Sequence, residues 1–424
     1  MSKRMILITV VELNPVLNLE GPYTLKYAQA MTEFSKADWN SMVTEEIIPF
    51  LEWEWLSALE ESGSTAPITG WYPLHLSLWK KDKLLAAAPL YLKNHSEGEF
   101  VWDYFWAKAS ASMGRPWYPK LIGTVPATPA EGYRFLFAPD EDPAALNRIL
   151  LDTAEAFCRK SGVRGLHFLF ADAAWAAWSG SLTERSYDGW KHSRFVWDNT
   201  FSDFQEYLSR FNKNQRKNIR KEYHRHEEQG IELTIIEGDD ADRRCFDHIF
   251  DLYSRTNDKF LPWDARWVNK FFFSLIEQHF RHRTVFSQAR RKVLSEKDVP
   301  EENKNPLALA MMFRKGNRIW GRYWGACEDI RDLHFAVCYY APMDYCIREK
   351  ILYFDPGIGS PHKIRRGFRV DFDHSYHKFF DPVLEMLFKT NIGMVNWHEE
   401  NAIAELNREL PYKNTMQEVF HNIL

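Results

Sequence analysis

The hydrophobic and polar residues of the first half alternate between the period of a helix and the period of a strand. Residues 143–161 read "PAALNRILLDTAEAFCRKS", with apolar positions every three to four residues. This spacing predicts an amphipathic helix, and Gly162 is a typical stop. Residues 49–64, "PFLEWEWLSALEESGS", predict a second helix with Pro49 in its first turn. Both segments are expected to pack one face against a core.

Short apolar runs around these helices predict strands. They are "LHLSLW", "LLAAAPLYLK", "EFVWDYFW", "GLHFLFAD" and "SRFVWDN". The first two flank the polar turn "KKDK", so the first three predict an antiparallel meander with Pro89 at an edge or bulge. The stretch "WYPKLIGTVPATPAEGYRF" is expected to be irregular, and its prolines Pro126 and Pro129 predict a rigid wall.

The second half repeats this order. Residues 201–230 predict a long helical region that ends at Gly230, followed by the strand "IELTII" and the helices "CFDHIFDLYSRTND" and "ARWVNKFFFSLIEQHF". A second meander is predicted from "TVFSQARR", from a hairpin "LALAMMFRKGNRIWGRYWG" that turns at residues 315–317, and from "DLHFAVCYY". The charged stretch "KVLSEKDVPEENKNP" is expected to be a loop. A short helix over 342–350 and a strand "ILYFD" follow.

The repeated order predicts two subdomains. A chain of 424 residues exceeds one ordinary core, and helices, an antiparallel meander, a helix and a strand occur twice. The two halves show no sequence identity, so the repetition is one of architecture. We predict an α+β fold of two tandem subdomains, residues 41–200 and 201–424, after an N-terminal extension of residues 1–40. Each subdomain is expected to have a central, mostly antiparallel mixed sheet flanked by helices.

Composition narrows the classes of function. The net charge of −4 implies no global attraction to nucleic acid or acidic lipid. Five cysteines without a CxxC pair argue against a disulfide framework and against a zinc site, so no metal is expected. No run approaches the ~18 consecutive apolar residues of a membrane span. We therefore expect a cytoplasmic protein without a membrane-spanning segment.

The stretch "FDPGIGSPHKIRRGF", residues 354–368, is the strongest candidate for an anion site. A glycine-rich turn exposes backbone N–H groups, and neighbouring cations strengthen its hold on phosphate. The candidate carrier-binding residues are Gly357, Gly359, Ser360, Lys363, Arg365 and Arg366. His362 is the candidate base, because the cations around it should lower its pKa. The alternatives are a basic surface loop and a structural histidine that caps it.

The stretch "GRYWG" is a second candidate. Strand alternation sets Arg322 and Trp324 on one face and Tyr323 on the other. A cation in a central strand points to a cleft, with a buried arginine–carboxylate pair as the alternative. Arg322 is therefore a candidate catalytic residue, and Tyr323 and Trp324 are candidate substrate contacts. His334 in the next predicted strand is expected to reach the same groove, unless it is an ordinary core histidine.

Three further basic residues are candidate substrate contacts. Lys217 and Arg220 lie on one face of the helix predicted over residues 210–225, which fits a tRNA or a diphosphate; a solvated basic helix is the alternative. Lys120 fits an anionic acceptor, with an ordinary loop lysine as the alternative. The sequence contains no signature of specific nucleic-acid recognition.

Eight phrases in order resemble a known bacterial family. They are "PFLEWEWLSALEESGS", "PLYLKNHSEGEFVWDYFWA", "YPKLIGTVPATPAEGYR", "RKNIRKE", "GRYWG", "LHFAVCYY", "FDPGIGSPHKIRRGF" and the later His377. Together they resemble the FemAB-like, peptidoglycan-biosynthesis-type family of the GNAT (acyl-CoA N-acyltransferase) superfamily, from about residue 49 to 381. In one respect the chain departs from the family pattern. Where the family loop reads Gly-Glu-His-Lys, this chain has Ser360, Pro361, His362 and Lys363, so a glutamate base is missing.

The resemblance implies two GNAT-like subdomains and transfer of an acyl or aminoacyl group to an amine. The implied co-substrates are acyl-CoA or aminoacyl-tRNA, with no permanently bound cofactor, and the implied acceptor is a small molecule or a cell-wall precursor. We expect direct attack by the amine, because no serine or cysteine lies in a recognisable nucleophile motif. The missing glutamate leaves a second hypothesis open, a non-catalytic protein that binds an anionic ligand or an envelope precursor. The oligomeric state is left open.

Overall fold

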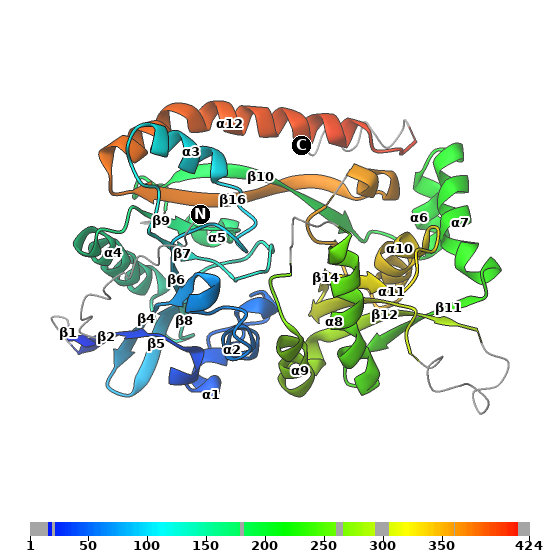
Figure 1. Cartoon of the computed structure of the whole chain (residues 1–424), viewed down its shortest axis with the longest axis horizontal. Helices are drawn as coiled ribbons and strands as arrows, with labels where there is room; N and C mark the ends of the chain where they lie inside the picture. The colour runs from blue at the N-terminus through cyan, green and yellow to red at the C-terminus, as the bar shows by residue number, and fades with distance from the viewer. Residues whose placement is uncertain are drawn as a thin grey trace.

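The computed structural model describes residues 16–18, 22–178, 182–259, 266–292, 305–359 and 361–413. It is an α+β structure with a small and a large sheet (Figure 1). The helices are α1 (Lys36–Asn40), α2 (Trp53–Glu61), α3 (Tyr104–Ser112), α4 (Pro143–Ser161), α5 (Ala173–Ala176), α6 (Phe204–Arg210), α7 (Lys213–Glu228), α8 (Arg243–Asp258), α9 (Lys270–His279), α10 (Leu333–Phe335), α11 (Ala341–Arg348) and α12 (Pro382–Arg408).

The small sheet belongs to the first half and is antiparallel throughout. Its strand order is β1–β2–β4–β5–β8. The strands are β1 (Val16–Asn18), β2 (Tyr23–Ala28), β4 (His75–Lys80), β5 (Lys83–Ala88) and β8 (Leu136–Phe137). The predicted hairpin around "KKDK" is therefore confirmed. Helix α4 packs on β4 and β5; Asp142 caps its N-terminus, and Gly162 ends it with a φ of 68°.

The large sheet runs through both halves of the chain. Its order is β11–β12–β13–β14–β15–β10–β16–β9–β7–β6–β3, and its neighbours are antiparallel except β14–β15 and β7–β9. The strands are β3 (Trp71–Pro73), β6 (Leu90–Lys93), β7 (Lys120–Gly123), β9 (Gly165–Phe168), β10 (Asp188–Asp198), β11 (Ile231–Glu237), β12 (Thr284–Arg291), β13 (Ala308–Lys315), β14 (Arg318–Ala326), β15 (Tyr353–Asp355) and β16 (Arg369–Phe379). The predicted α+β class with mostly antiparallel mixed sheets is confirmed.

The long ribbon of β10 and β16 joins the two halves. The two strands pair from Asp188–His377 to Val196–Arg369, and β16 also pairs with β9 of the first half. Helix α12 packs along this ribbon, across the top of Figure 1. The domain boundaries predicted near residues 40 and 200 stay predictions.

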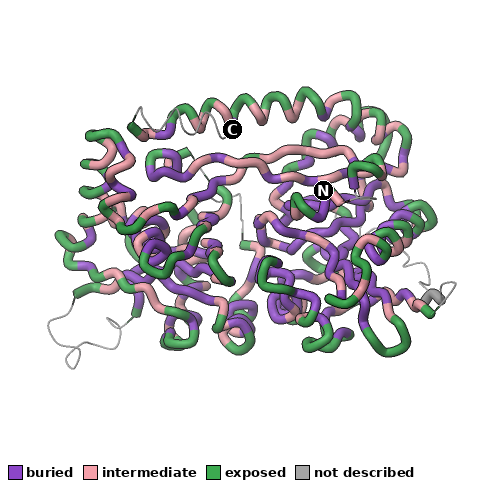
Figure 2. The backbone as a smooth tube through the Cα atoms, turned by 180° about the vertical axis from the view of Figure 1, so that it is seen from behind, coloured by how far each residue is buried: buried purple, intermediate pink, exposed green. Residues whose placement is uncertain are grey.

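A shared aromatic core also connects the halves. Trp55 of α2 is fully buried, with its ring 5.2 Å from that of Phe272 on α9 and 4.8 Å from that of Phe313 on β13. Figure 2 shows buried backbone through the interior of both halves, whereas much of α12 is exposed. Edge-to-face aromatic pairs of this kind stabilise a packed interior. Some of the aromatic residues of the chain are therefore core residues.

Several predicted elements differ from the observed ones. "DLHFAVCYY" forms no strand but a helical run of α10, a π-helical turn (η7, Ala336–Tyr340) and α11. "EFVWDYFW" leads into α3, whose Trp106 and Ser110 are buried one turn apart. Aromatic-rich apolar runs fit both periods, so tertiary packing decides between them. The stretch predicted to be irregular contains β7, and the long helix is divided into α6 and α7, where Asn212 caps α7. Most of the predicted charged loop lies outside the described residues.

Candidate functional site

A cavity of about 360 Å³ lies where β14 and β15 separate. The two strands pair in parallel only from Arg318–Tyr353 to Trp320–Asp355. Beyond this point β14 continues, whereas the chain after β15 turns away through Gly357, whose φ is 80°. A Cβ atom on Gly357 would lie 3.0 Å from the carbonyl oxygen of Gly321, so the turn favours glycine both sterically and conformationally.

Most of the predicted loop and strand residues meet at this cavity. Its lining includes Arg322, Tyr323, Trp324, His334, Gly357, Gly359, His362 and Lys363. The first half closes it with Pro129, consistent with the predicted wall, and with Phe100 and Ala127. Sequence reasoning missed Phe100, Asn257 of α8 and Trp267, because nothing in their local pattern distinguishes them from core or surface residues. Ser360 lies outside the described residues.

Lys363 is a buried cation in the cavity wall. Its side chain is almost completely inaccessible, and Nζ donates a hydrogen bond to the carbonyl oxygen of Gly357 at 2.7 Å. Burial lowers the pKa of Lys363 to about 7, although the attraction of Asp355 opposes the shift. The ammonium and the neutral amine are therefore both populated near neutral pH. A buried lysine of this kind is a common functional group.

Arg322 forms a buried pair with a carboxylate, which its sequence pattern left open as the alternative to a catalytic role. Its Nη2 lies 2.9 Å from Oδ2 of Asp355, and the arginine side chain is only 4% exposed. Arg322 also donates to the carbonyl oxygens of Gly321 at 2.7 Å and of Pro129 at 3.3 Å. Oδ1 of Asp355 in turn accepts a hydrogen bond from the Gly357 backbone N–H at 2.7 Å. The pair thus ties β14, the loop and the first half together at the edge of the cavity.

Two neutral histidines face the same space. Burial, with further contributions from Arg366 and Lys363, lowers the pKa of His362 to about 4. Burial also lowers the pKa of His334 to about 3. The predicted direction for His362 is confirmed, although burial outweighs the neighbouring cations. The rings lie 5.9 Å apart, and Tyr339 Oη is 3.1 Å from Nε2 of His362. His334 lies in α10 and not in a strand, as its prediction assumed.

The other two cations of the loop do not line the cavity. Arg366 is buried and pairs with Glu222 of α7 at 2.6 Å, while its guanidinium stacks on Phe335 at 3.3 Å. These contacts hold the short helix η8 (Pro361–Arg366) against α7 and α10, which is a structural role. Arg365 is exposed. Contact of either residue with a carrier stays a prediction.

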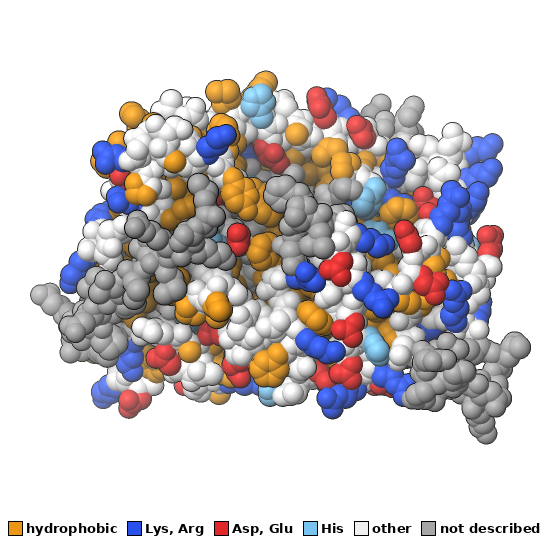
Figure 3. Space-filling view, in the orientation of Figure 1, with side chains coloured by type: hydrophobic (Ala, Val, Ile, Leu, Met, Phe, Trp, Pro, Cys, Tyr) orange, Lys and Arg blue, Asp and Glu red, His pale blue; other side chains and the backbone are white. Residues whose placement is uncertain are grey.

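The remaining basic candidates also lie away from the cavity lining. Lys120 is buried between Glu99 at 2.6 Å and Asp103 at 2.7 Å. Burial alone would lower the pKa of Lys120, but the two carboxylates hold it above its ordinary value. Lys217 and Arg220 are exposed on α7, and Figure 3 shows blue side chains over the region of α6 and α7. Their predicted substrate contacts stay predictions.

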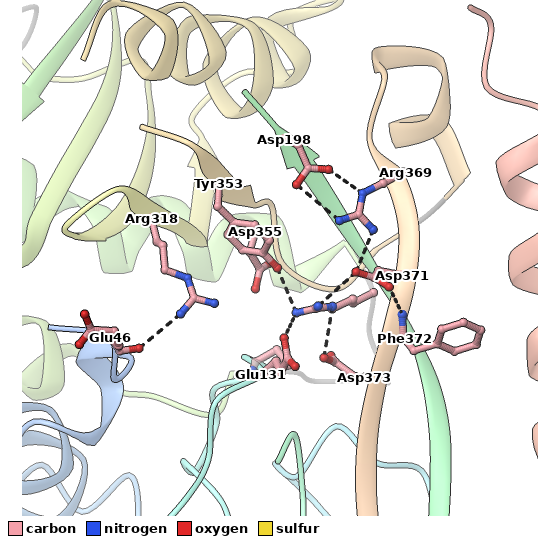
Figure 4. Close-up of polar contacts among 12 residues, drawn as sticks. Glu46, Glu131, Asp198, Arg318, Tyr353, Asp355, Arg369, Asp371, Phe372 and Asp373 are labelled. Atoms are coloured by element: carbon pink, nitrogen blue, oxygen red, sulfur yellow. Dashed lines mark hydrogen bonds and ion pairs between the residues drawn. The ribbon is translucent and has the colours of Figure 1, made fainter. Parts of the chain in front are cut away.

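A cluster of charged residues around Arg194 of β10 borders this site. Figure 4 labels the residues that Arg194 contacts, Glu131, Tyr353, Asp371 and Asp373. Arg194 contacts Glu131, whose loop also carries Pro129, and lies 3.3 Å from Asp371 and 3.5 Å from Asp373 of β16. Tyr353 of β15 accepts a hydrogen bond from Arg194 at 3.0 Å. One arginine therefore joins the ribbon, the first half and the strand that leads into the loop.

Asp373 makes this cluster sensitive to pH. Burial is the largest effect and raises the pKa of Asp373 to about 8, despite the nearby Arg194. A carboxyl that binds its proton more tightly in the folded state lowers stability as pH rises, here from about pH 4 to about pH 8. We expect Asp373→Asn to remove this fall, because asparagine mimics the protonated form. Urea unfolding at pH 5 and pH 8 measures the effect, with Asp344→Asn on α11 as a control. Parallel pH dependence of wild type and Asp373→Asn would contradict the expectation.

The small antiparallel sheet, the large mixed sheet, the separating strands and the polar cavity define an α+β protein with a candidate ligand site. A family model covers residues 30–414, and the chain belongs to that family, FemAB-like, described as peptidoglycan biosynthesis/recognition. Membership supports a peptidoglycan-related acyl or aminoacyl transferase at the level of the family, without a particular substrate. None of the helices in the described ranges is long and apolar enough to cross a membrane.

Solved structures show similarity to this chain at low sequence identity. FemX is similar with a TM-score of 0.50 and 12% identity over 85% of this chain and 98% of FemX. The C-terminal domain of a putative lysylphosphatidylglycerol synthetase from Agrobacterium fabrum has a TM-score of 0.47 and 10% identity over 86% of this chain and 98% of its own. A tandem GNAT protein from the clavulanic acid biosynthesis pathway has a TM-score of 0.41 and 10% identity over 85% of this chain and 99% of its own. No curated protein matches the sequence.

Proposed function

We propose that this chain transfers an acyl or aminoacyl group from a phosphate-rich carrier, acyl-CoA or aminoacyl-tRNA, to an amine. A cell-wall precursor is the acceptor that family membership favours. The observation that carries the proposal is the convergence of Lys363, Arg322 and two neutral histidines on one cavity at the separation of β14 and β15. The cytoplasmic location stays a prediction.

In such a transfer each of these cavity residues has a different role. Lys363 in its ammonium form supplies a charge-assisted hydrogen bond to an anionic group of the donor or to the oxygen that becomes negative during attack. Arg322 is already paired with Asp355, so its main task is to position the loop. His362 and His334 accept a hydrogen bond from the attacking amine. Their lowered pKa values make them weak bases, so the amine is expected to arrive already neutral.

Direct transfer of the acyl group agrees with the state of the one thiol among the described lining residues. Cys338 is the cysteine there, and burial raises its pKa well above the ordinary value. A thiol needs to lose its proton to act as a nucleophile, so a protonated Cys338 does not favour an acyl-enzyme. The proposed step is therefore attack of the amine nitrogen on the acyl carbonyl carbon. The amine proton leaves with the carrier group as the amide bond forms.

A product search tests the proposal. Purified protein is incubated with acyl-CoA or with aminoacyl-tRNA and a panel of primary amines that includes muropeptide amines. High-resolution mass spectrometry should detect a new amide that depends on the protein and on the donor. Tight donor binding without any amide, across both carriers, would instead support the non-catalytic binding protein. Native mass spectrometry of freshly purified protein adds an independent search for a retained carrier.

A further inference from the structure

The charged residues described in the cavity lining are all positive. Among its described residues none is an aspartate or a glutamate, whereas Arg322 and Lys363 are cations. Large apolar and aromatic side chains supply much of the remaining surface. They include Phe100, Tyr253, Trp267, Met311 and Trp324. Burying a charged group among such residues is costly unless an opposite charge or several hydrogen bonds compensate it.

Several oxygen atoms at the edge of the cavity are already engaged by cations of the chain. The carbonyl oxygens of Gly321 and Pro129 accept hydrogen bonds from Arg322, and that of Gly357 accepts one from Lys363. The nearby carboxylate of Asp355 is 7% exposed and is bound to Arg322 and to a backbone N–H. A second ammonium group entering the cavity would compete with Arg322 and Lys363 for these oxygen atoms.

The lowered pKa values of the two histidines also indicate that the cavity disfavours positive charge. In both His334 and His362 burial and the neighbouring cations Arg366 and Lys363 act together to disfavour the charged imidazolium. A free ammonium on a ligand meets the same desolvation and the same repulsion. A neutral or anionic group does not, because Lys363 can donate to it.

We propose that the cavity accepts an uncharged, largely apolar acyl group and disfavours an acyl group with a free ammonium. A simple acyl donor, and not an aminoacyl donor, is then the substrate class of the transfer. This inference rests on the proposed function and narrows it. The carrier itself, CoA or tRNA, lies mostly outside a cavity of about 360 Å³, so the selection acts on the transferred group.

Two donor pairs test the inference with the carrier held constant. Butyryl-CoA and β-alanyl-CoA differ by a methyl against an ammonium at the same position. N-acetylalanyl-tRNA and alanyl-tRNA differ by whether the amine is masked. Binding is measured at pH 7 from the fluorescence of the full-length protein, since Trp267 and Trp324 line the cavity. Turnover is measured separately as amide formation.

The uncharged member of at least one pair should bind at least about 10-fold more tightly than its charged partner. Equal or tighter binding of both ammonium-bearing members overturns the inference. So does a failure of all four donors to bind. Amide formation from any donor supports the proposed function whichever member is preferred. A charged preference with turnover would thus reject the inference and keep the function.

A single substitution should shift the preference. Asn257 lines the cavity and donates to the carbonyl oxygen of Tyr253, one turn earlier, at 2.9 Å. Asn257→Asp adds a carboxylate with little change in shape, so the preference for the uncharged donor should fall by about threefold or more. Asn401→Asp on α12 is the matched control, because Asn401 makes the same bond to Trp397 at 2.7 Å away from the cavity. An unchanged ratio in a folded Asn257→Asp protein, or an equal shift in the control, counts against the inference.

Discussion

Replacing Lys363 with methionine should weaken binding of the acyl donor by about 10- to 100-fold at pH 6.5, because a charge-assisted hydrogen bond contributes about 1.5–3 kcal/mol. The pKa of Lys363 is about 7 in the free protein, so the ammonium form is the minor one above that pH. Wild-type affinity should therefore decline as pH rises through 7, and binding above this pH should take up a proton. The Lys363→Met protein should show neither effect.

The same substitution should leave the fold intact. Lys363 is buried at a cost, since its lowered pKa means that the unfolded chain binds its proton more tightly. Wild-type stability should therefore rise between about pH 7 and pH 10.5, and Lys93, with a pKa also near 7, contributes in the same direction. In the Lys363→Met protein this rise in stability with pH should be smaller than in the wild type. At pH 7 the variant should be at least as stable as the wild type.

Donor titrations at pH 6.5 and pH 8.5, together with thermal unfolding, measure both effects. Lys389→Met on the exposed face of α12 removes a lysine by the same change and serves as the control, with unaltered affinity expected. If Lys363→Met keeps wild-type affinity at pH 6.5, Lys363 does not contact the donor. If it loses affinity together with stability, the loss is structural.

Replacing Arg194 with methionine should produce the largest loss of stability, about 3–5 kcal/mol, as expected when one partner is removed from a buried ionic cluster. Arg194 is the shared partner of Glu131, Asp371 and Asp373, and its side chain is only 17% exposed. Without it the carboxylates repel one another across the junction of the halves. The loss should shrink at low pH, where the carboxyl groups bind protons.

Urea unfolding at pH 5 and pH 7.5 tests this expectation. Arg348→Met is the comparison, because Arg348 makes a mostly exposed pair with Asp344 at 3.3 Å. Such surface pairs contribute about 0–1 kcal/mol, so this variant should resemble the wild type. Similar unfolding midpoints for the two variants would show that Arg194 does not stabilise the junction.

Local patterns predicted the elements that have strong periodicity or clear turn chemistry. The helix over 143–161, the hairpin at 315–317 and the strand before the loop agree with the structure. The loop composition "DPGIGSPHK" also singled out Gly357, Gly359, His362 and Lys363, which the structure brings to one cavity. The predictions of these elements succeeded because their physical causes are local, namely one-sided apolar faces and turn residues.

The sequence by itself thus determined the α+β class, the family resemblance and the loop that contributes most to the cavity. The tertiary structure alone decided the rest. It made "DLHFAVCYY" helical, paired β16 with β10 and β9, and turned Arg366 toward Glu222 instead of the cavity. It also set the pKa values of Lys363 and Asp373. Each of these outcomes depends on contacts between residues far apart in the chain, and burial and pairing of that kind leave no local pattern to read.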